Sequence, residues 1–336
     1  MDSRYSRQEI YPPIGKAGQQ KIGKAHIAIV GCGALGSLQA EVLTRAGIGF
    51  LTIIDRDFVE PVNLQRQSLF TEENARQSIP KAIAAAERLK EINSNVEVKP
   101  FVSDLNSDNV RLLSGVDLIV DGTDNFQTRY LLNDFAWKQR IPWIYGACVG
   151  SSAVACAFVP PDFPCLRCLF EAEPAAGSAP TCDTAGIIWP AVGTVVAYQV
   201  ATAFQILVGH DLSAQLLQAD LWQGYYHTVS LKNAKRPDCT TCALHLYPSL
   251  ERATGFEIAM CGRDAVQIKP QSKGAIALDE VEERWKNIGV AYRNPFLAKL
   301  IIGENEIVLF SDGRAIIKGT QDPVRARDLY SKYVGS

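Results

Sequence analysis

The chain has 336 residues, of which 47% are hydrophobic and 21% are charged, and its formal net charge is −2. This composition excludes a disordered or fibrous protein, and the mixture of acidic and basic residues argues against nucleic acid as a partner. A chain of this length has room for one large α/β domain and a small second one.

The N-terminus is polar and gives no targeting signal. Residues 1–7 are charged and lack the apolar core of a signal peptide, so we expect a cytoplasmic protein. Arg4 and Arg7 lie in the segment Arg-Tyr-Ser-Arg-Gln, and arginines so close to a terminus are usually solvated. Residues 15–24 then predict a short polar helix before the first strand.

A glycine-rich turn follows the first apolar run. Residues 27–30, Ile-Ala-Ile-Val, have the length and β-branched content of a strand that is buried on both faces. They lead into Gly31-Cys-Gly33-Ala-Leu-Gly36, after which residues 37–46 predict a helix. Such glycines allow a tight turn, a close approach to phosphate and close helix packing, and the helix N-terminus favours an anion. The turn predicts a nucleotide site, and alone it is most typical of NAD or FAD.

The second strand, residues 50–55, ends in a carboxylate. Asp55 follows Gly31 at about the 20-residue interval that is typical of a carboxylate bound to ribose. A loop comes next at the carboxyl edge of the sheet, where ligands of open α/β sheets bind. This loop contains Asp57, Asn63, Gln65 and Arg66.

A lysine opens the next predicted helix. Pro80 and the alanine-rich run after it favour a helix that ends at Asn93. Lys81 lies in the first turn, where a positive charge opposes the helix dipole unless it faces an anion. This placement favours a phosphate ligand, although lysines are also common on protein surfaces. A strand at 96–102 and a short helix at 109–113 follow.

Residues 116–121 predict another strand that ends in carboxylates, Asp121 and Asp124. Asp124 begins the long predicted helix 125–140, where the ordinary role of an aspartate is to cap the N-terminus. Two carboxylates beside a phosphate loop are also what Mg²⁺ uses together with nucleotide phosphates. The pattern therefore favours an ATP enzyme over a dehydrogenase, which has no use for such a metal.

Two Cys-x-x-Cys pairs predict a structural zinc site. Strands are expected at 142–145 and 154–159, and the pairs are Cys165–Cys168 and Cys239–Cys242. Four thiolates complete a tetrahedral zinc site, which here would join two distant parts of one domain. A redox dithiol is the alternative for either pair alone. Nine cysteines without an export signal argue against a disulfide framework.

The stretch between the two pairs contains a further cysteine and an uncharged segment. Residues 175–186 are rich in small residues and predict a flexible exposed loop, in which Cys182 is a candidate nucleophile; free cysteines are more often small core residues. Residues 186–209 could span a bilayer by length. Because Pro190, Gly193 and Gln199 dilute their hydrophobicity, we expect a buried or interface helix at 191–208 and no membrane partner.

The pattern changes near residue 250. Strands are expected at 266–269, 299–302, 306–310 and 315–318, with helices at 278–286 and 323–333 and a hairpin turn at Asp312-Gly313. The order β-α-β-β-β-α predicts a small α+β domain. We expect a first domain at 1–250, a linker at 251–262 and a second domain at 263–336.

Together these motifs resemble the MoeB and ThiF family of bacterial adenylyltransferases for ubiquitin-like sulfur carriers, which is related to ubiquitin-activating enzymes. The resemblance covers roughly residues 1–250. It implies a Rossmann-like nucleotide-binding domain with a mixed sheet and a structural zinc site, to which this chain adds the small C-terminal domain. It also implies ATP, Mg²⁺ and Zn²⁺, and adenylylation of the C-terminal glycine of a carrier that ends in Gly-Gly, with release of pyrophosphate. The pathway would be the biosynthesis of the molybdopterin cofactor or of the thiazole of thiamin.

The resemblance also implies roles for individual residues. Asp55 would bind the ribose, Asp124 the Mg²⁺, and Asn63, Arg66 and Lys81 the phosphates. Arg7 would reach across the interface of a homodimer, and Cys182 matches a position that some members use for a covalent link to the carrier. The rest of the ATP site would be Gly31, Gly33, Ala34 (commonly a glycine in the family), Gly36, Asp57, Gln65 and Asn125, and the zinc ligands Cys165, Cys168, Cys239 and Cys242.

The sequence leaves three other functions open. An NAD-dependent oxidoreductase rests on the glycine turn alone and explains neither Lys81, Asp124 nor the cysteine pairs. A non-catalytic scaffold of the same fold does not explain the set of converging charges, which are costly without a ligand. A relative that adenylates a tRNA base fits poorly with the unremarkable net charge and the two cysteine pairs.

Overall fold

The computed structural model describes residues 4–174, 181–252, 257–259, 264–269 and 276–335. The chain divides into two compact units, Met1–Arg252 and Ala253–Ser336. The limits expected from the sequence, 1–250, 251–262 and 263–336, stay a prediction, and three residues of the expected linker form a strand, Glu257–Ala259.

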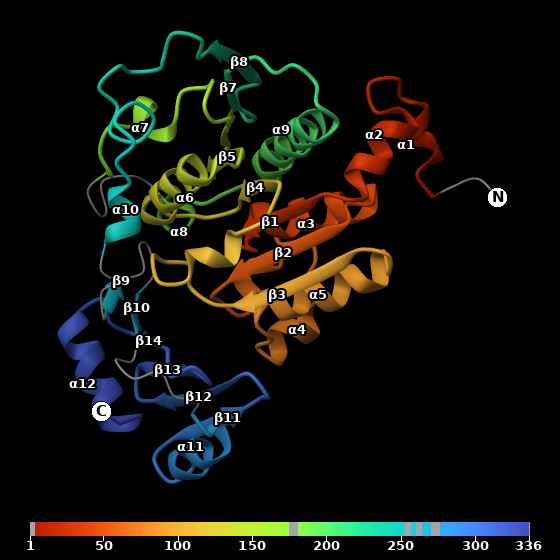
Figure 1. Cartoon of the computed structure of the whole chain (residues 1–336). Coiled ribbons are helices and arrows are strands. Elements are labelled where there is room, and N and C mark those ends of the chain that lie inside the picture. Colours follow the sequence, from red (N-terminus) through yellow and green to blue (C-terminus); the bar gives the residue numbers. More distant parts are fainter. Residues whose placement is uncertain (1–3, 175–180, 253–256, 260–263, 270–275, 336) are drawn as a thin grey trace. The chain divides into compact units, whose positions relative to one another are not determined.

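The first unit is built on one mixed sheet (Figure 1), which confirms the expected α/β fold. Its strand order is β3-β2-β1-β4-β5-β6-β7-β8. Strands β1 to β5 are parallel, and β6, β7 and β8 are antiparallel to their neighbours. The strands are β1 His26–Val30, β2 Phe50–Asp55, β3 Glu97–Val102, β4 Leu118–Asp121, β5 Trp143–Val149, β6 Ser152–Phe158, β7 Gln215–Asp220 and β8 Tyr225–Ser230.

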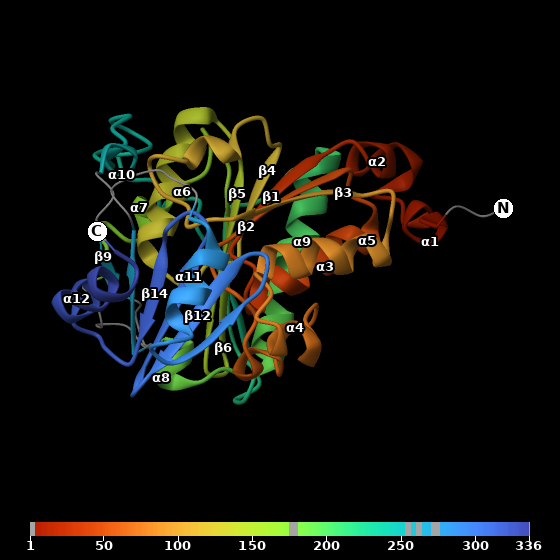
Figure 2. The ribbon, with the colours of Figure 1, turned by 90° about the horizontal axis from the view of Figure 1, so that it is seen from below.

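Helices cover both faces of this sheet. One core packs α3, α5 and α9 against one face, and a second core packs α6 against the other, as Figure 2 shows. The helices are α1 Ser6–Ile10, α2 Gly15–Ile22, α3 Ala34–Ala46, α4 Glu72–Arg76, α5 Lys81–Ile92, α6 Phe126–Gln139, α7 Leu166–Leu169, α8 Cys182–Ala185, α9 Trp189–Val208 and α10 Pro248–Glu251, with 3₁₀ turns at Pro61–Asn63 and Val110–Leu113.

Strand order places the expected ligand site at a topological switch point. After β1 the chain forms β2 and β3 on one side and then returns to form β4 on the other side of β1. The loops that follow β1 and β4 therefore leave the sheet in opposite directions and open a crevice at its carboxyl edge. The glycine turn and the segment with Asp124 are these two loops.

Helix α9 is the uncharged segment expected to be a buried or interface helix. It is long and apolar enough to cross a membrane by length and composition, and 44% of its most apolar 18-residue window is buried inside this structure. Its inner side packs against α3, β5 and β6. Its N-terminus has a proline in the first turn, and Gly209, with φ of 81°, ends it in the left-handed conformation that glycine favours.

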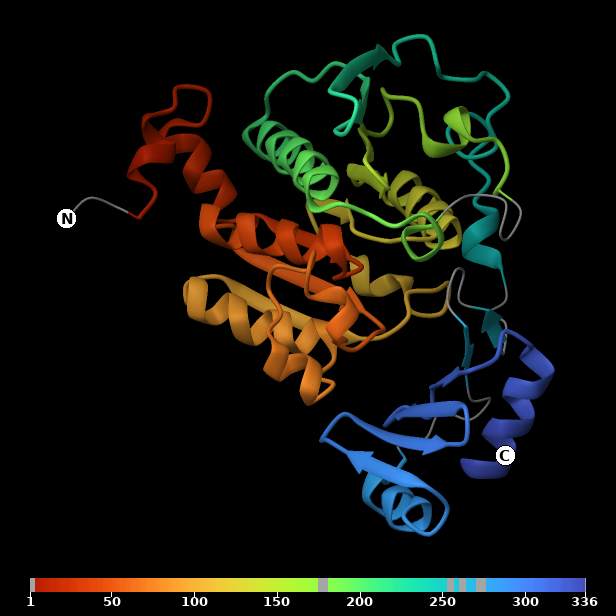
Figure 3. The same cartoon turned by 180° about the vertical axis from the view of Figure 1, so that it is seen from behind.

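Several elements differ from the sequence predictions. Helix α3 begins at Ala34 instead of residue 37, so part of the glycine motif is helical. Strands β7 and β8 and helices α1, α4, α7 and α10 carry no sequence prediction, and α8 lies where the sequence predicted a loop. All six residues of the edge strand β8 are exposed, so no burial pattern marks it. Figure 3 shows the red helices α1 and α2 beside the N-terminus.

The second unit is an antiparallel sheet with two helices, which confirms the α+β class expected for this part. Its strand order is β11-β12-β13-β14-β10-β9, and one core joins the sheet to both helices. Two of its strands, β9 and β11, were not expected from the sequence. The elements are β9 Glu257–Ala259, β10 Ala265–Ile268, α11 Leu278–Trp285, β11 Val290–Arg293, β12 Leu297–Ile302, β13 Asn305–Phe310, β14 Ala315–Lys318 and α12 Pro323–Tyr333.

Candidate active site

Three glycines bring the loops after β1 and β4 into direct backbone contact. Gly31 has φ of 85°, and a Cβ there would lie 2.6 Å from the carbonyl oxygen of Gly122. A Cβ on Gly36 would lie 1.8 Å from the carbonyl oxygen of Gly31, so neither position accepts another residue. Gly33 differs, because the nearest atom to a Cβ placed there would be Gln67 Nε2, at 3.9 Å. Packing within the protein explains Gly31 and Gly36, and Gly33 leaves space for a ligand.

Asp55 holds the glycine loop from the end of β2. Its carboxylate accepts hydrogen bonds from the backbone N–H of Cys32 at 2.6 Å and from that of Asp57 at 2.7 Å. Burial raises the pKa of the Asp55 carboxyl, and the positive charge of Lys81 acts in the opposite direction. Asp55 therefore fixes the loop that would carry phosphate, and its oxygens keep lone pairs for a further donor.

Lys81 is buried next to an acidic side chain. It is the first residue of α5, is 3% exposed, and its Nζ lies 3.5 Å from Asp57 Oδ2. Its backbone N–H also donates to the carbonyl of Asp57. The helix-opening lysine thus faces an anion, as its position in the sequence suggested, and the anion in the protein is Asp57. A polyanionic ligand at this point would meet a positive charge that is already in place.

The loop after β2, which begins with a 3₁₀ turn, presents two buried amides. Asn63 is 4% exposed and Gln67 is 3% exposed, and within the described residues Asn63 Oδ1 and Gln67 Oε1 have no hydrogen-bond partner. The carbonyl of Asn63 accepts the N–H of Gln67, so the two side chains sit one helical turn apart on one side. Gln65, the expected ligand, is exposed. Helical spacing from Asn63 is the sequence feature that could have identified Gln67.

Arg66, from the same loop, is half-buried. Its Nη1 donates to the carbonyl of Val62 at 3.0 Å, and the described residues include no carboxylate that pairs with it. Its charge is close enough to act on the thiol of Cys148 at the end of β5. An arginine at the carboxyl edge of the sheet that has no counter-ion in the described part of the chain is suited to binding phosphate.

The two carboxylates after β4 have different environments. Asp121 is fully buried and forms an ion pair with Arg129, so it does not face a ligand. The expectation of two carboxylates for Mg²⁺ reduces to one, Asp124, which is exposed. Asp124 does not cap α6; Asn125 does, because its side chain accepts the N–H of Thr128 at 2.8 Å. The carboxylate of Asp124 therefore lies at the crevice. One such carboxylate is enough, because Mg²⁺ is usually bound by only one or two carboxylates together with phosphates.

Cys182 lies on one turn of helix, α8, next to the end of β5. Thr181 caps this helix, and the thiol of Cys182 donates to the carbonyl of Cys148 at 3.4 Å. Burial raises the pKa of the Cys148 thiol to about 12, and Cys182 adds to that shift. The thiols of Cys148 and Cys182 are therefore neighbours. The sequence indicated only Cys182 as a candidate. Residues 175–180 of the expected exposed loop lie outside the described residues.

Arg7 is far from the other expected site residues in the same chain. It lies on α1, is exposed, and makes no hydrogen bond or ion pair with the residues that the structure describes. The adjacent Gln8 donates to the carbonyl of Ala46 at the last residue of α3. The glycine loop is at the first residue of α3, and 13 residues of helix span about 20 Å.

The four predicted metal ligands come together. All four thiol sulfurs lie within 4.8 Å of one another, and the separations of Cys165 from Cys239 and of Cys168 from Cys242 are both 3.4 Å. Sulfurs about 2.3 Å from one zinc ion in a tetrahedron lie about 3.8 Å apart, so the residues fit zinc. Four converging thiols favour one shared metal over a separate redox dithiol.

A buried carboxylate on α6 holds both halves of this cysteine cluster. Asp134 accepts hydrogen bonds from Arg167 at 3.1 and 3.2 Å, and from Thr241 Oγ1 at 2.7 Å. The adjacent Asn133 accepts the backbone N–H of Leu166 at 2.8 Å. Arg167 and Leu166 belong to the first cysteine pair and Thr241 to the second, so α6 sets their separation. No sequence pattern indicated this role for Asp134.

Known proteins resemble the chain in sequence and fold. The ThiF family matches residues 5–241. The sulfur carrier protein ThiS adenylyltransferase of Bacillus subtilis is 42% identical over 338 residues, covering 100% of both chains. The sulfur carrier protein adenylyltransferase of Thermus thermophilus is 34% identical and covers 77% of this chain and 96% of that protein. A crystal structure of E. coli MccB with MccA-N7isoASN has a similar fold, with a TM-score of 0.63 at 22% identity over 72% of this chain and 75% of MccB.

Proposed function

The chain belongs to the ThiF family, and on this basis we propose that it adenylylates the C-terminal carboxylate of a ubiquitin-like sulfur carrier that ends in Gly-Gly, with release of pyrophosphate from ATP. One observation carries the proposal. A sulfur carrier adenylyltransferase matches the chain from end to end at 42% identity. The comparisons therefore favour a nucleotidyltransferase over the NAD-dependent oxidoreductase and over a non-catalytic scaffold.

The arrangement at the switch point supports ATP as the nucleotide. Gly33, directly before α3, leaves room for phosphate, and the N–H groups of the first turn of a helix, which begins here at Ala34, bind anions. We assign Lys81 and Arg66 to the phosphates, Asp55 to a ribose hydroxyl, and Asn63 and Gln67 to polar groups of the nucleotide. Gln67 takes the place that the sequence assigned to Gln65, because Gln67 is the buried one.

Attack of a carboxylate on ATP requires that the negative charges be neutralised and the two reactants be positioned. A carboxylate is already ionised at neutral pH, so it can attack the α-phosphorus of ATP without a general base. Its oxygen forms the new bond to phosphorus as the bond to the pyrophosphate oxygen breaks. Lys81 and Arg66 would offset the negative charge of the reacting phosphates, and Asp124 would hold Mg²⁺, which neutralises phosphate charge when it is bound.

We infer that the carrier is of the thiazole type. A relative that matches the whole chain, residues 253–336 included, is named for ThiS, whereas the Thermus thermophilus relative covers 77% of this chain. The molybdopterin-type carrier is the second candidate. The cytoplasmic location that the sequence suggests stays a prediction, and Cys182 stays the candidate for a covalent link to the carrier.

ATP–pyrophosphate exchange with purified carriers tests the proposed function. We expect exchange with the thiazole-type carrier, none without a carrier, and none with a carrier that lacks its last glycine. Exchange with the molybdopterin-type carrier alone would correct the pathway and leave the reaction standing. Absence of exchange with every Gly-Gly carrier, together with stoichiometric binding of a nicotinamide cofactor, would reinstate the oxidoreductase.

The surface of the first unit supports a homodimer. Strand β8 is wholly exposed, and Trp222 and Tyr226 of the β7–β8 hairpin are 79% and 61% exposed. More than half of the most apolar part of α9 is also not buried within this unit. Large exposed apolar surfaces mark protein contacts. Because Arg7 lies about 20 Å from the glycine loop of its own chain, we propose that it completes the site of a partner subunit.

Mixing two inactive variants tests this arrangement. Arg7→Ala and Asp124→Ala are each expected to lose about 100-fold in exchange rate, because each removes a charge that faces the phosphates. In a mixed dimer one site has an intact Asp124 and receives Arg7 from the other subunit. Unfolding and refolding an equal mixture should therefore restore about a quarter of wild-type activity.

The neighbouring arginine supplies the control for this experiment. Arg4 lies on the same segment and its Nη1 reaches only the carbonyl of Ile92, at 3.5 Å. Arg4→Ala should keep wild-type exchange. A refolded mixture that stays as inactive as its components, although light scattering shows mixed dimers, would mean that Arg7 does not act across the interface.

A further inference from the structure

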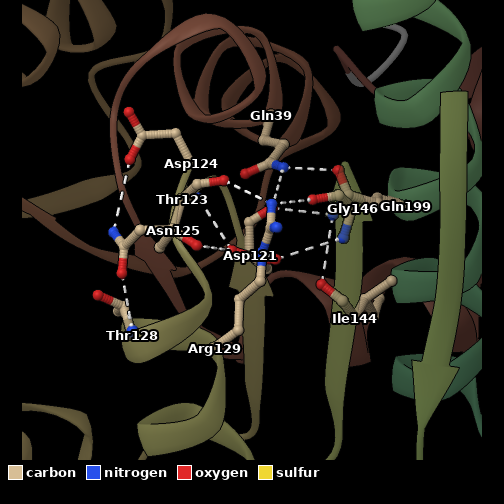
Figure 4. A network of polar contacts seen from close by, with 10 residues as sticks. All are labelled: Gln39, Asp121, Thr123, Asp124, Asn125, Thr128, Arg129, Ile144, Gly146 and Gln199. Carbon is tan, nitrogen blue, oxygen red and sulfur yellow. Dashed lines mark hydrogen bonds and ion pairs between the residues drawn. The ribbon is translucent and has the colours of Figure 1, made fainter. Parts of the chain in front are cut away.

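A buried ion pair lies directly behind the loop that carries Asp124. Arg129 is 5% exposed and Asp121 is 0% exposed, and Arg129 Nε donates to Asp121 Oδ2 at 3.0 Å (Figure 4). Burial lowers the pKa of Arg129, but the neighbouring Asp121 raises it by more, so the guanidinium stays charged. Removing two charges from water is costly, and a buried pair is a weak source of stability. Stability alone therefore does not explain why Arg129 and Asp121 form a buried ion pair here.

The guanidinium group joins the loop to the neighbouring strand. Arg129 Nη2 donates to the carbonyl of Thr123 at 2.8 Å and to that of Gly146, on β5, at 3.0 Å. Asp121 Oδ1 accepts from the backbone N–H of Thr123 at 2.8 Å and from its Oγ1 at 2.6 Å. Thr123 is thus held through its N–H, its carbonyl and its hydroxyl by one ion pair, one residue before Asp124.

Helices from the other face of the sheet reach the same point. Gln39 on α3 and Gln199 on α9 each donate through Nε2 to the backbone carbonyl of Asp121 at 2.9 Å, as Figure 4 shows. The two amides also bond to each other at 2.6 Å. A Cβ on Gly146 would lie 2.5 Å from Gln199 Nε2, so a side chain there would displace the Gln199 amide. The end of β4 is therefore fixed to α3, α9, α6 and β5 together.

The same loop is pressed against the glycine loop. A Cβ on Gly122 would lie 2.4 Å from the carbonyl oxygen of Gly31 and 3.0 Å from the backbone of Gly36. Asn125 then fixes the other end of the loop by capping α6. The backbone on both sides of Asp124 is held, so contacts within the protein set the distance between this residue and the glycine loop.

We propose that Arg129 is a positioning residue, which through Asp121 and Thr123 sets the place where Asp124 holds a divalent cation against the nucleotide phosphates. This proposal rests on the proposed function. The forked guanidinium is required, because it reaches Asp121, Thr123 and Gly146 at once, and a lysine with one ammonium group cannot. A shift of the loop by a fraction of an ångström would weaken metal binding and leave the nucleotide contacts of Asp55 and Lys81 intact.

Arg129→Lys separates metal binding from nucleotide binding. With a non-hydrolysable ATP analogue bound, Mn²⁺ affinity measured by electron paramagnetic resonance should fall about 10- to 100-fold. The Mg²⁺ concentration for half-maximal exchange should rise by the same factor, and excess Mg²⁺ should restore the rate. Binding of the analogue without metal should stay within about twofold of wild type, since its own contacts are unchanged.

Two further variants keep the test decisive. Arg314→Lys changes an arginine that is equally buried, at 3% exposure, in the second unit, and should leave Mn²⁺ affinity unchanged. Thr123→Val removes the 2.6 Å hydrogen bond to Asp121 without a change of shape, and should weaken Mn²⁺ binding by about fivefold even if Arg129→Lys does not fold. Unchanged Mn²⁺ affinity in folded Arg129→Lys and Thr123→Val overturns the proposal. Failure of the proposed function is distinct, since then the wild type shows no exchange and no metal-dependent nucleotide binding.

Discussion

Replacing Asp124 with asparagine is expected to lower ATP–pyrophosphate exchange by about 10²- to 10³-fold, the usual effect of removing one fixed charge from a reaction centre. Asp121 cannot substitute for it, because its carboxylate is buried against Arg129. The melting temperature should stay at the wild-type value, since Asp124 is exposed and Asn125 caps α6. Exchange rate at saturating carrier and calorimetric melting measure the two effects.

An exposed aspartate in the second unit gives the matched control. Asp279→Asn on α11 makes the same chemical change at an exposed position and should keep the full exchange rate. If Asp124→Asn retained exchange within about tenfold of wild type, the metal would have to be held by other groups. The proposal that Arg129 positions Asp124 for metal binding would then be wrong.

Loss of zinc is expected to have the largest effect on stability. A zinc ion would link Cys165 and Cys168 to Cys239 and Cys242, and a cross-link across some 70 residues stabilises a fold by about 4 kcal/mol when only loop entropy is counted. In a unit of this size that corresponds to a drop of about 8–16 °C in melting temperature. Removal of the ion by a chelator, or Cys242→Ser, should produce it, and calorimetry with metal analysis would record both changes.

A cysteine outside the cluster provides the comparison. Cys182→Ser should keep about one zinc ion per chain and the wild-type melting temperature, because Cys182 lies on α8 beside Cys148 and is not one of the four ligands. A protein that is isolated without zinc and melts at the same temperature after Cys242→Ser would show that the four thiols stabilise the fold without a metal.

Local sequence patterns predicted several of the elements that carry the candidate site, and the cysteine cluster. The apolar run 50–55 is strand β2 with the expected limits, and Lys81 opens α5 as its proline and alanines indicate. The spacing of the two cysteine pairs indicated a cluster, and the four thiols do converge. These features succeed because strand burial, helix initiation and metal ligation each depend on residues within a few positions of one another.

Other assignments needed the folded chain. Asp121 and Asp124 look equivalent as two carboxylates after a strand, yet Arg129, eight residues further on, turns Asp121 into a structural group. Gln67 and not Gln65 is buried beside Gly33, because a backbone hydrogen bond from Gln67 to Asn63 turns the chain there. Strand β8 has no apolar alternation, since every one of its residues is exposed, and so it escaped prediction.

One physical cause separates the features that the sequence predicts from those that only the tertiary structure decides. The glycine turn, the helix starts and the cysteine spacing express local conformational preferences, which adjacent residues fix before any tertiary contact exists. The position of Asp124 depends instead on Gln39, Asp121, Arg129 and Gln199, which four separate elements bring together at distances that no local pattern encodes. The buried charges of Asp121 and Arg129 are stable only once these partners surround them. The role of this ion pair is therefore visible only in the packed structure.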